Sequence, residues 1–130
     1  MTPKQEKSLV RYISEVGKEY GLTGWQVGLS FDAHDAVAAE VTCVYGRRIA
    51  HLSVSHDFLD FTPEEQRQVI VHELTHIHLD QMQTLIHDLL PEVMGRPAFD
   101  AFIAGYRQAM EHATDAIADA IAPNFPLWEG

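Results

Sequence analysis

The boundary at residues 62–65 constrains the fold of this chain more than any other feature. These residues, Thr-Pro-Glu-Glu, combine an N-cap threonine, a proline at the first helical position and a capping-box glutamate, which predict that a helix starts at Pro63. Pro91 is expected to stop it, so the helix would run toward Leu90 over about 40 Å unless it breaks on the way. No repeat, low-complexity tract or linker divides the chain. Residues 1–130 are therefore expected to form one domain.

Helical periodicity also marks segments on either side of this long helix. In residues 4–20 apolar side chains recur at helical intervals, and Gly21 follows at the position of a C-terminal cap. Pro97 opens a further helix that Pro123 ends, and an irregular tail follows at residues 124–130. The apolar face predicted for this last helix comprises Phe99, Phe102, Ile103, Tyr106, Met110, Ala113, Ile117 and Ile121.

Between the first and second helices the sequence changes to short apolar runs that are rich in β-branched residues. Residues 25–31, 36–45 and 47–55 are predicted to be strands, with a loose turn at residues 32–35 and a hairpin turn at residues 45–48. The last two strands are expected to be antiparallel. The predicted fold class is α+β, with an N-terminal helix, a small three-stranded and mainly antiparallel sheet, and two C-terminal helices.

Composition and charge limit the classes of function. The chain has 19 Asp and Glu residues against 9 Lys and Arg, and this net charge of -10 repels phosphate backbones, so nucleic acid is not expected as a partner. Cys43 is the only cysteine, which excludes a disulfide framework and fits a reducing compartment. Residues 1–7 are polar, and no run approaches the about 18 apolar residues of a membrane span. We therefore expect a cytoplasmic protein with no membrane segment.

The motif His-Glu-x-x-His occupies residues 72–76, inside the predicted long helix. Residues four apart on a helix lie one above the other, so His72 and His76 can direct their imidazole nitrogens to one metal ion. Glu73 is rotated around the helix, misses the ion and can accept a proton from attacking water. The motif predicts a Zn²⁺ site with Glu73 as general base. The alternative, two surface histidines on an acidic helix, is disfavoured by the apolar opposite face of the helix.

A catalytic zinc ion usually has three protein ligands, so a further ligand is needed. The residue six positions after His76 is Met82, which excludes the metzincin pattern. In the following helix Glu111 and Asp115 lie one turn apart, so that Glu111 could ligate the metal while Asp115 fixes the tautomer of a ligand histidine. The alternative role of Glu111 is an ion pair with Arg107 on a solvated face. The other candidate ligands are Asp80, Glu92 and Asp119.

The string HELTH, followed at a distance by E-x-x-x-D, resembles the gluzincins, the thermolysin-like zinc metallopeptidases, in a minimal single-domain form. The order of elements is also similar to the protease domain of the ImmA/IrrE type. The resemblance implies a zinc-dependent endopeptidase with the ligands His72, His76 and Glu111, the general base Glu73, and Asp115 as the partner of His72. It departs from thermolysin at Met110, where an asparagine would support the second histidine.

Further side chains are candidates for contacting the substrate. Tyr106 is predicted to help hold the developing oxyanion, with His51 and His112 as alternatives. By the resemblance, residues 36–45 would form the sheet edge that pairs with an extended peptide, and Glu40 on this edge would disfavour acidic substrates.

Three functions are compatible with these patterns. The first is a zinc-dependent endopeptidase acting on a peptide or protein substrate. The second is a non-catalytic or latent zinc-binding interaction module, and the third is a DNA-associated protease of the SprT-like kind, which the net charge disfavours. No pattern indicates an oligomeric state.

The tail at residues 124–130 carries three large apolar side chains in a segment too short for a core of its own. Packing against the first helix or the sheet is the expected solution. The alternative is that the tail occupies the substrate cleft, with Glu129 or the terminal carboxylate as a further zinc ligand.

Overall fold

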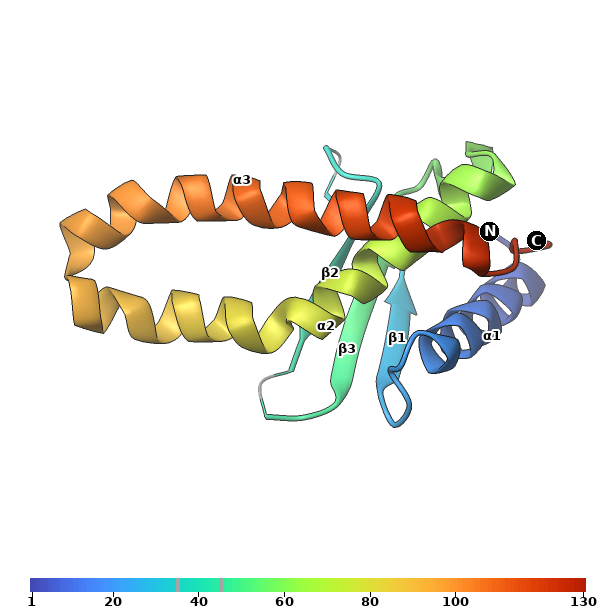
Figure 1. The fold of residues 1–130 in the computed structure, drawn as a ribbon. Coiled ribbons are helices and arrows are strands. Elements are labelled where there is room, and N and C mark those ends of the chain that lie inside the picture. Colours follow the sequence, from blue (N-terminus) through green and yellow to red (C-terminus); the bar gives the residue numbers. More distant parts are fainter. Residues whose placement is uncertain (35, 45) are drawn as a thin grey trace.

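Two long helices and a small sheet form the framework of the molecule (Figure 1). The computed structural model describes residues 1–34, 36–44 and 46–130. Its elements are α1 (Pro3–Glu19), β1 (Gln26–Ser30), β2 (Ala39–Cys43), β3 (Ile49–Val54), η1 (Phe58–Asp60), α2 (Pro63–Met94), α3 (Arg96–Ile121) and η2 (Ala122–Asn124). The α+β class and the predicted order of helix, three strands and two helices are confirmed.

The sheet has the order β1-β3-β2, so β3 is central and β2 forms an edge. β2 and β3 are antiparallel, as expected, whereas β1 is parallel to β3. The sheet is therefore mixed rather than mainly antiparallel. A parallel pair needs a crossover connection, and here β2 is part of that connection. Of the two predicted turns, Asp35 and Tyr45 lie outside the described residues.

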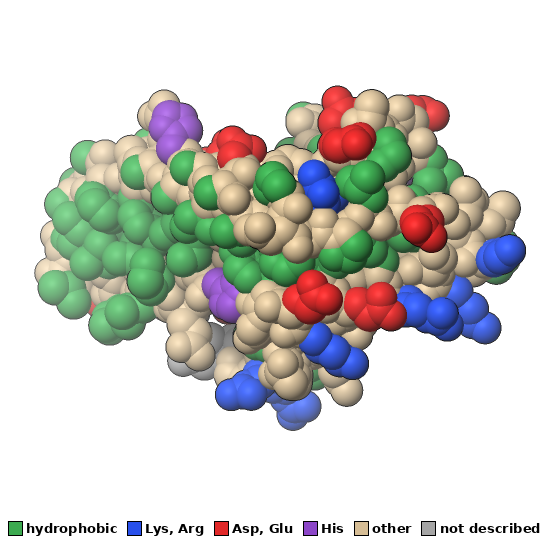
Figure 2. Space-filling view, turned by 45° about the vertical axis from the view of Figure 1, so that its right-hand side comes forward, with side chains coloured by type: hydrophobic (Ala, Val, Ile, Leu, Met, Phe, Trp, Pro, Cys, Tyr) green, Lys and Arg blue, Asp and Glu red, His purple; other side chains and the backbone are tan. Residues whose placement is uncertain are grey.

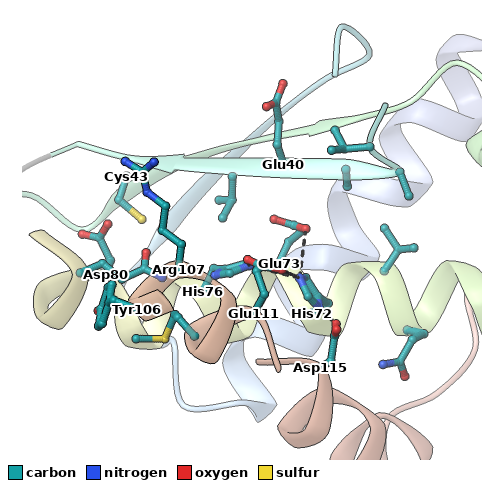
Figure 3. Close-up of a pocket in the computed structure, with 18 of the residues that line it drawn as sticks. Glu40, Cys43, His72, Glu73, His76, Asp80, Tyr106, Arg107, Glu111 and Asp115 are labelled. Atoms are coloured by element: carbon teal, nitrogen blue, oxygen red, sulfur yellow. Dashed lines mark hydrogen bonds and ion pairs between the residues drawn. The ribbon is translucent and has the colours of Figure 1, made fainter. Parts of the chain in front are cut away.

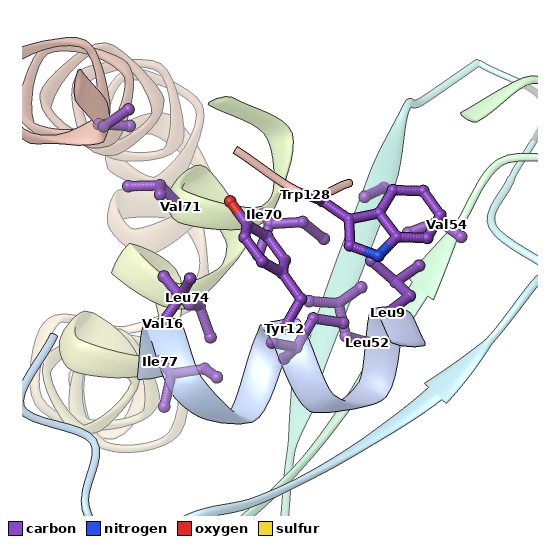
Figure 4. Close-up of a cluster of buried hydrophobic side chains, with 14 of the residues drawn as sticks. Leu9, Tyr12, Val16, Leu52, Val54, Ile70, Val71, Leu74, Ile77 and Trp128 are labelled. Carbon is purple, nitrogen blue, oxygen red and sulfur yellow. The ribbon is translucent and has the colours of Figure 1, made fainter. Parts of the chain in front are cut away.

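One face of the sheet carries the hydrophobic core, which α1 and α2 cover (Figure 4). Leu52 and Val54 of β3 point to these helices and are fully buried. His51, between Ala50 and Leu52 in the strand, is exposed on the opposite face because successive side chains of a strand alternate. All described helices are too short or too polar to cross a membrane.

α1 forms as its periodicity predicts. The apolar residues Leu9, Tyr12, Ile13 and Val16 are buried against the core, and they lie at helical intervals. The helix ends before Gly21, whose φ of 80° is a conformation that side chains rarely adopt.

α2 starts at the predicted boundary. The Thr62 hydroxyl oxygen accepts a hydrogen bond from the Glu65 backbone N–H (3.2 Å), and the Glu65 carboxylate accepts one from the Thr62 N–H (2.8 Å). The expectation that Pro91 ends the helix is wrong, because α2 continues to Met94 and ends at Gly95 (φ 82°). A proline removes a single N–H donor. Near a projecting helix end, water can bond the carbonyl that this loss leaves unpaired.

α2 and α3 form an antiparallel hairpin whose far end projects beyond the sheet (Figure 1). Figure 2 shows hydrophobic side chains gathered on this end of the molecule. The large apolar residues exposed there are Met82, Leu85, Leu89, Val93, Met94 and Phe102.

The predicted apolar face of α3 is only partly correct. Phe99 and Ile103 are buried as expected, but Phe102 and Ile117 are exposed. In the second half of the helix the buried positions are Thr114 and Ala118, one residue along from the predicted ones. Thr114 can occupy a buried position because its hydroxyl donates to the Met110 carbonyl oxygen at 2.8 Å.

The tail packs against α1, as the expected solution requires. The Trp128 side chain is 5% exposed, and its indole N–H donates to Ser8 Oγ at 3.0 Å (Figure 4). The Tyr12 hydroxyl donates to the Pro126 carbonyl oxygen at 2.7 Å. The alternative placement in the substrate cleft is therefore wrong, and the tail acts as a structural strap.

Replacement of Trp128 by alanine is expected to destabilise the fold by about 3–5 kcal/mol, because it removes a large buried side chain. The melting temperature, followed by circular dichroism, should fall by roughly 10–20 °C. Leu127→Ala is the matched control. Because Leu127 is 38% exposed, this variant should lose much less stability than Trp128→Ala. Equal losses in the two variants would show that the tail does not hold the core through Trp128.

Candidate metal centre

The two long helices place the motif residues in a pocket of about 720 Å³ beside the edge strand β2 (Figure 3). α2 contributes His72, Glu73 and His76, and α3 contributes Glu111 and Asp115. All five residues that the sequence predicted as zinc ligands, general base and histidine partner line this one pocket.

The atoms expected to hold the metal converge on one point. His72 Nε2 lies 3.1 Å from His76 Nε2, and Glu111 places its two carboxylate oxygens 3.0 Å from His76 Nε2 and 3.5 Å from His72 Nε2. Tetrahedral coordination with bonds of about 2.0–2.1 Å separates the ligand atoms by about 3.3 Å. The observed separations are close to this spacing, so the three side chains could hold a metal ion, and a donor set of two imidazoles and one carboxylate is one that zinc accepts.

Asp115 orients the first histidine. Its carboxylate oxygen lies 2.9 Å from His72 Nδ1, so that ring nitrogen carries the proton and donates it to Asp115. In the neutral imidazole this leaves the lone pair of His72 on Nε2, the atom that faces Glu111 and His76. This is the arrangement in which an outer carboxylate sets the tautomer of a metal ligand.

The electrostatics of the cluster favour a bound cation. Burial lowers the pKa of His76, which keeps its imidazole neutral and able to ligate, although Glu111 partly opposes this effect. Glu73 is 6% exposed, and burial raises its pKa to about 8, with Glu111 and Glu40 adding to the effect. A positive charge nearby would favour the ionised form of Glu73.

The alternative third ligands lie apart from the cluster. Asp119 accepts a hydrogen bond from Gln68 Nε2 at 2.7 Å, and Glu92 is exposed near the far end of the hairpin. Asp80 lines the pocket but interacts with Cys43, whose thiol has its pKa raised to about 12 by burial and by Asp80. The ion pairs of Glu111 among the described residues are with the two histidines rather than with Arg107.

Of the three candidates for the oxyanion, the structure places one in the pocket. Tyr106 lines it, and its buried hydroxyl has no hydrogen-bond partner among the described residues. Burial raises the pKa of Tyr106, so the phenol is neutral and available as a donor. His51 lies on the far face of the sheet, and His112 is exposed and does not line the pocket.

Several residues that line the pocket were not predicted as site residues, among them Gln83, His87 and Arg107. Gln83 and His87 continue the helical row of His72, His76 and Asp80 along α2, so the periodicity that placed the motif could also have indicated them. Arg107 precedes Glu111 by one turn, but the sequence indicated it only as an ion-pair partner for that residue.

Comparison of the chain with protein-family models, with curated proteins and with solved structures gives no match.

Glu111→Ala should abolish zinc binding, because it removes one of the three converging ligands. Metal content after dialysis against zinc, measured by mass spectrometry, should be one ion per chain in the wild type and close to none in this variant. Asp119→Ala is the matched control, since Asp119 lies outside the pocket on the same helix, and it should retain the metal. Zinc retained in the Glu111 variant would contradict its assignment as the third ligand.

Asp115→Asn should weaken zinc binding by about 10- to 100-fold without abolishing it, because Asp115 acts through the orientation of His72. Competition with a chromogenic chelator would measure this change. An affinity equal to that of the wild type would show that the bond to His72 Nδ1 does not tune the ligand.

Proposed function

We propose that the protein is a zinc-dependent endopeptidase. The observation that carries this proposal is the position of Glu73, a buried carboxyl group 3.9 Å from His72 Nε2, beside three converging ligands. A purely structural zinc site usually has four protein ligands and no general base, whereas the proposed ligands here are three, with the Glu73 carboxyl group beside them as the candidate base.

The residues of the pocket would have separate roles in hydrolysis. A zinc ion held by His72, His76 and Glu111 would polarise the scissile carbonyl and lower the pKa of the attacking water. Glu73 accepts the proton of that water and then delivers it to the leaving amine nitrogen. We assign the donation of a hydrogen bond to the developing oxyanion to the neutral hydroxyl of Tyr106, which lines the same pocket.

The free edge of β2 supports a peptide as the substrate. The bonds from Val44 N–H to the Ile49 carbonyl and from Ser55 N–H to the Ala38 carbonyl, both 2.9 Å, mark the even-numbered residues of this strand as those bonded to β3. Bonding alternates along an antiparallel strand, so Ala39, Val41 and Cys43 direct their N–H and C=O groups to the free edge. These three residues line the pocket, where an extended peptide can add as a further strand.

Glu73→Gln is expected to retain one zinc ion and to lower peptide cleavage by at least about 100-fold, because it removes the general base. The assay incubates a mixture of proteome-derived peptides with the zinc-loaded protein and identifies the products by mass spectrometry. Glu64→Gln, which changes an exposed carboxylate at the start of the same helix, is the matched control.

Cleavage by the Glu73 variant at the rate of the wild type would contradict the proposed role of Glu73. A wild type that binds zinc stoichiometrically but cleaves none of the peptides would instead favour the zinc-binding interaction module. In that protein the metal would only connect α2 to α3.

A further inference from the structure

The pocket does not end at the metal cluster but continues along the hairpin, away from Asp115. This second part, called here the hairpin side of the pocket, is lined by Cys43, Asp80, Gln83, His87, Tyr106 and Arg107. Because β2 runs along the pocket from Ala39 to Cys43, a peptide paired with its edge would extend into the hairpin side. Side chains there would contact substrate residues next to the scissile bond.

Acidic side chains outnumber basic ones in the lining of the pocket. The carboxyl groups are those of Glu40, Glu73, Asp80, Glu111 and Asp115. Arg107 is the only Lys or Arg among the described residues that line it. An arginine among so many carboxyl groups is expected to form an ion pair, yet Arg107 has no carboxylate oxygen of a described residue within the 4.0 Å of a salt bridge.

The neighbouring carboxyl groups already have other partners. Glu111 faces the two histidines, Asp115 bonds to His72 Nδ1, and Asp80 interacts with the Cys43 thiol. Glu40, on β2, bonds to His34 Nδ1 at 2.8 Å and points away from Glu73 (Figure 3). The guanidinium donors of Arg107 therefore remain available to a group that enters the pocket.

Arg107 lies close enough to the proposed metal ligands to contact substrate residues near the scissile bond. Arg107 precedes Glu111 by four residues, so it lies about 6 Å along α3 from the proposed metal ligand. In Figure 3 its side chain extends from α3 toward β2, across the hairpin side of the pocket. An extended peptide advances about 3.3 Å per residue, so this guanidinium can reach a group within about two or three residues of the scissile bond.

We propose that Arg107 is a specificity residue that binds a carboxylate of the substrate on the hairpin side of the pocket. The planar guanidinium can donate two parallel hydrogen bonds to such a group. The carboxylate is either that of an Asp or Glu side chain or that of the C-terminus of the peptide. This inference rests on the proposed peptidase function, and it reverses the expectation from Glu40 that acidic substrates are disfavoured.

The test measures binding separately from hydrolysis. Fluorescein-labelled peptides of about eight residues bind to zinc-loaded Glu73→Gln protein, and fluorescence anisotropy gives the dissociation constants. One set has an amidated C-terminus and carries a single Glu at each position in turn, a second carries Gln instead, and a third is neutral with a free C-terminal carboxylate. The third set distinguishes a terminal carboxylate from a side chain.

At one position at least, the carboxylate peptide should bind about fivefold more tightly than its neutral counterpart, a value at the upper end for an exposed ion pair. Adding Arg107→Gln should remove this preference, and Arg107→Lys should keep only part of it because lysine lacks the planar fork. Arg96→Gln is the matched control, since Arg96 lies on α3 outside the pocket, and it should keep the full preference. The Arg107 variants should melt at the temperature of the parent protein, because Arg107 forms no ion pair with any residue that the structure describes.

Equal binding of acidic and neutral peptides, an acid preference that persists in Arg107→Gln, or no binding of any peptide would each overturn the role of Arg107. Cleavage of the same peptides by the protein that retains Glu73 is measured in parallel. Cleavage without an acid preference overturns the role of Arg107 alone. An acid preference without cleavage overturns the peptidase function and leaves the carboxylate site in place.

Discussion

The packing of the first half of α2 against the sheet and α1 determines where the three motif residues on this helix lie. Ile70, Leu74 and Ile77 are almost fully buried, so the rotation of α2 about its own axis is set by the core. His72, Glu73 and His76 occupy the rows between the buried ones and therefore face the edge of β2 and α3. Regular backbone geometry within a long, well-capped helix holds these side chains more rigidly than a loop would. The chemistry of the pocket thus depends on hydrophobic contacts made on the other side of the same helix.

The third ligand depends on a second packing interface, between α2 and α3. Thr114 and Ala118 are completely buried, and these small side chains allow the two helices to approach closely. Thr114 lies between Glu111 and Asp115 in the sequence, so its burial turns both carboxylates toward the two histidines. The strap formed by residues 125–128 continues this anchoring, because its backbone carbonyls accept hydrogen bonds from Tyr12 and Arg67. Contacts with no chemical role therefore keep the donor atoms within 3.5 Å of one another.

Many features that depend on local interactions were predictable, although the end of α2 and part of the buried face of α3 were not. The capping box at Thr62, the periodicity of α1 and the spacing of His72 and His76 involve residues one or two turns apart, where sequence and geometry are directly related. The parallel pairing of β1 with β3 brings together strands separated by another strand, which no local pattern specifies. The choice of Glu111 over Asp119 is intermediate, because both lie on one helix, about 12 Å apart along its axis, and the packing of α3 on α2 sets which of them lies beside the histidines. The lack of an ion pair between Arg107 and the described residues could not be predicted from the sequence. It depends on the tertiary contacts of the nearby carboxylates, which have other partners.

The pocket combines features that oppose folding in the absence of a ligand. It buries the Glu73 carboxyl group, whose pKa rises to about 8, and it holds Glu111 next to it, so that two acids share a site of reduced polarity. It also brings His72 Nε2 within 3.1 Å of His76 Nε2. The bond from His72 Nδ1 to Asp115 leaves the lone pair of the neutral His72 ring on Nε2, where it faces the second imidazole. Each of these arrangements becomes favourable when a cation lies between the donors, because the cation attracts both carboxylates and both lone pairs. The buried faces of α2 and α3 offset this cost, because Ile70, Leu74, Thr114 and Ala118 on the two helices are completely buried.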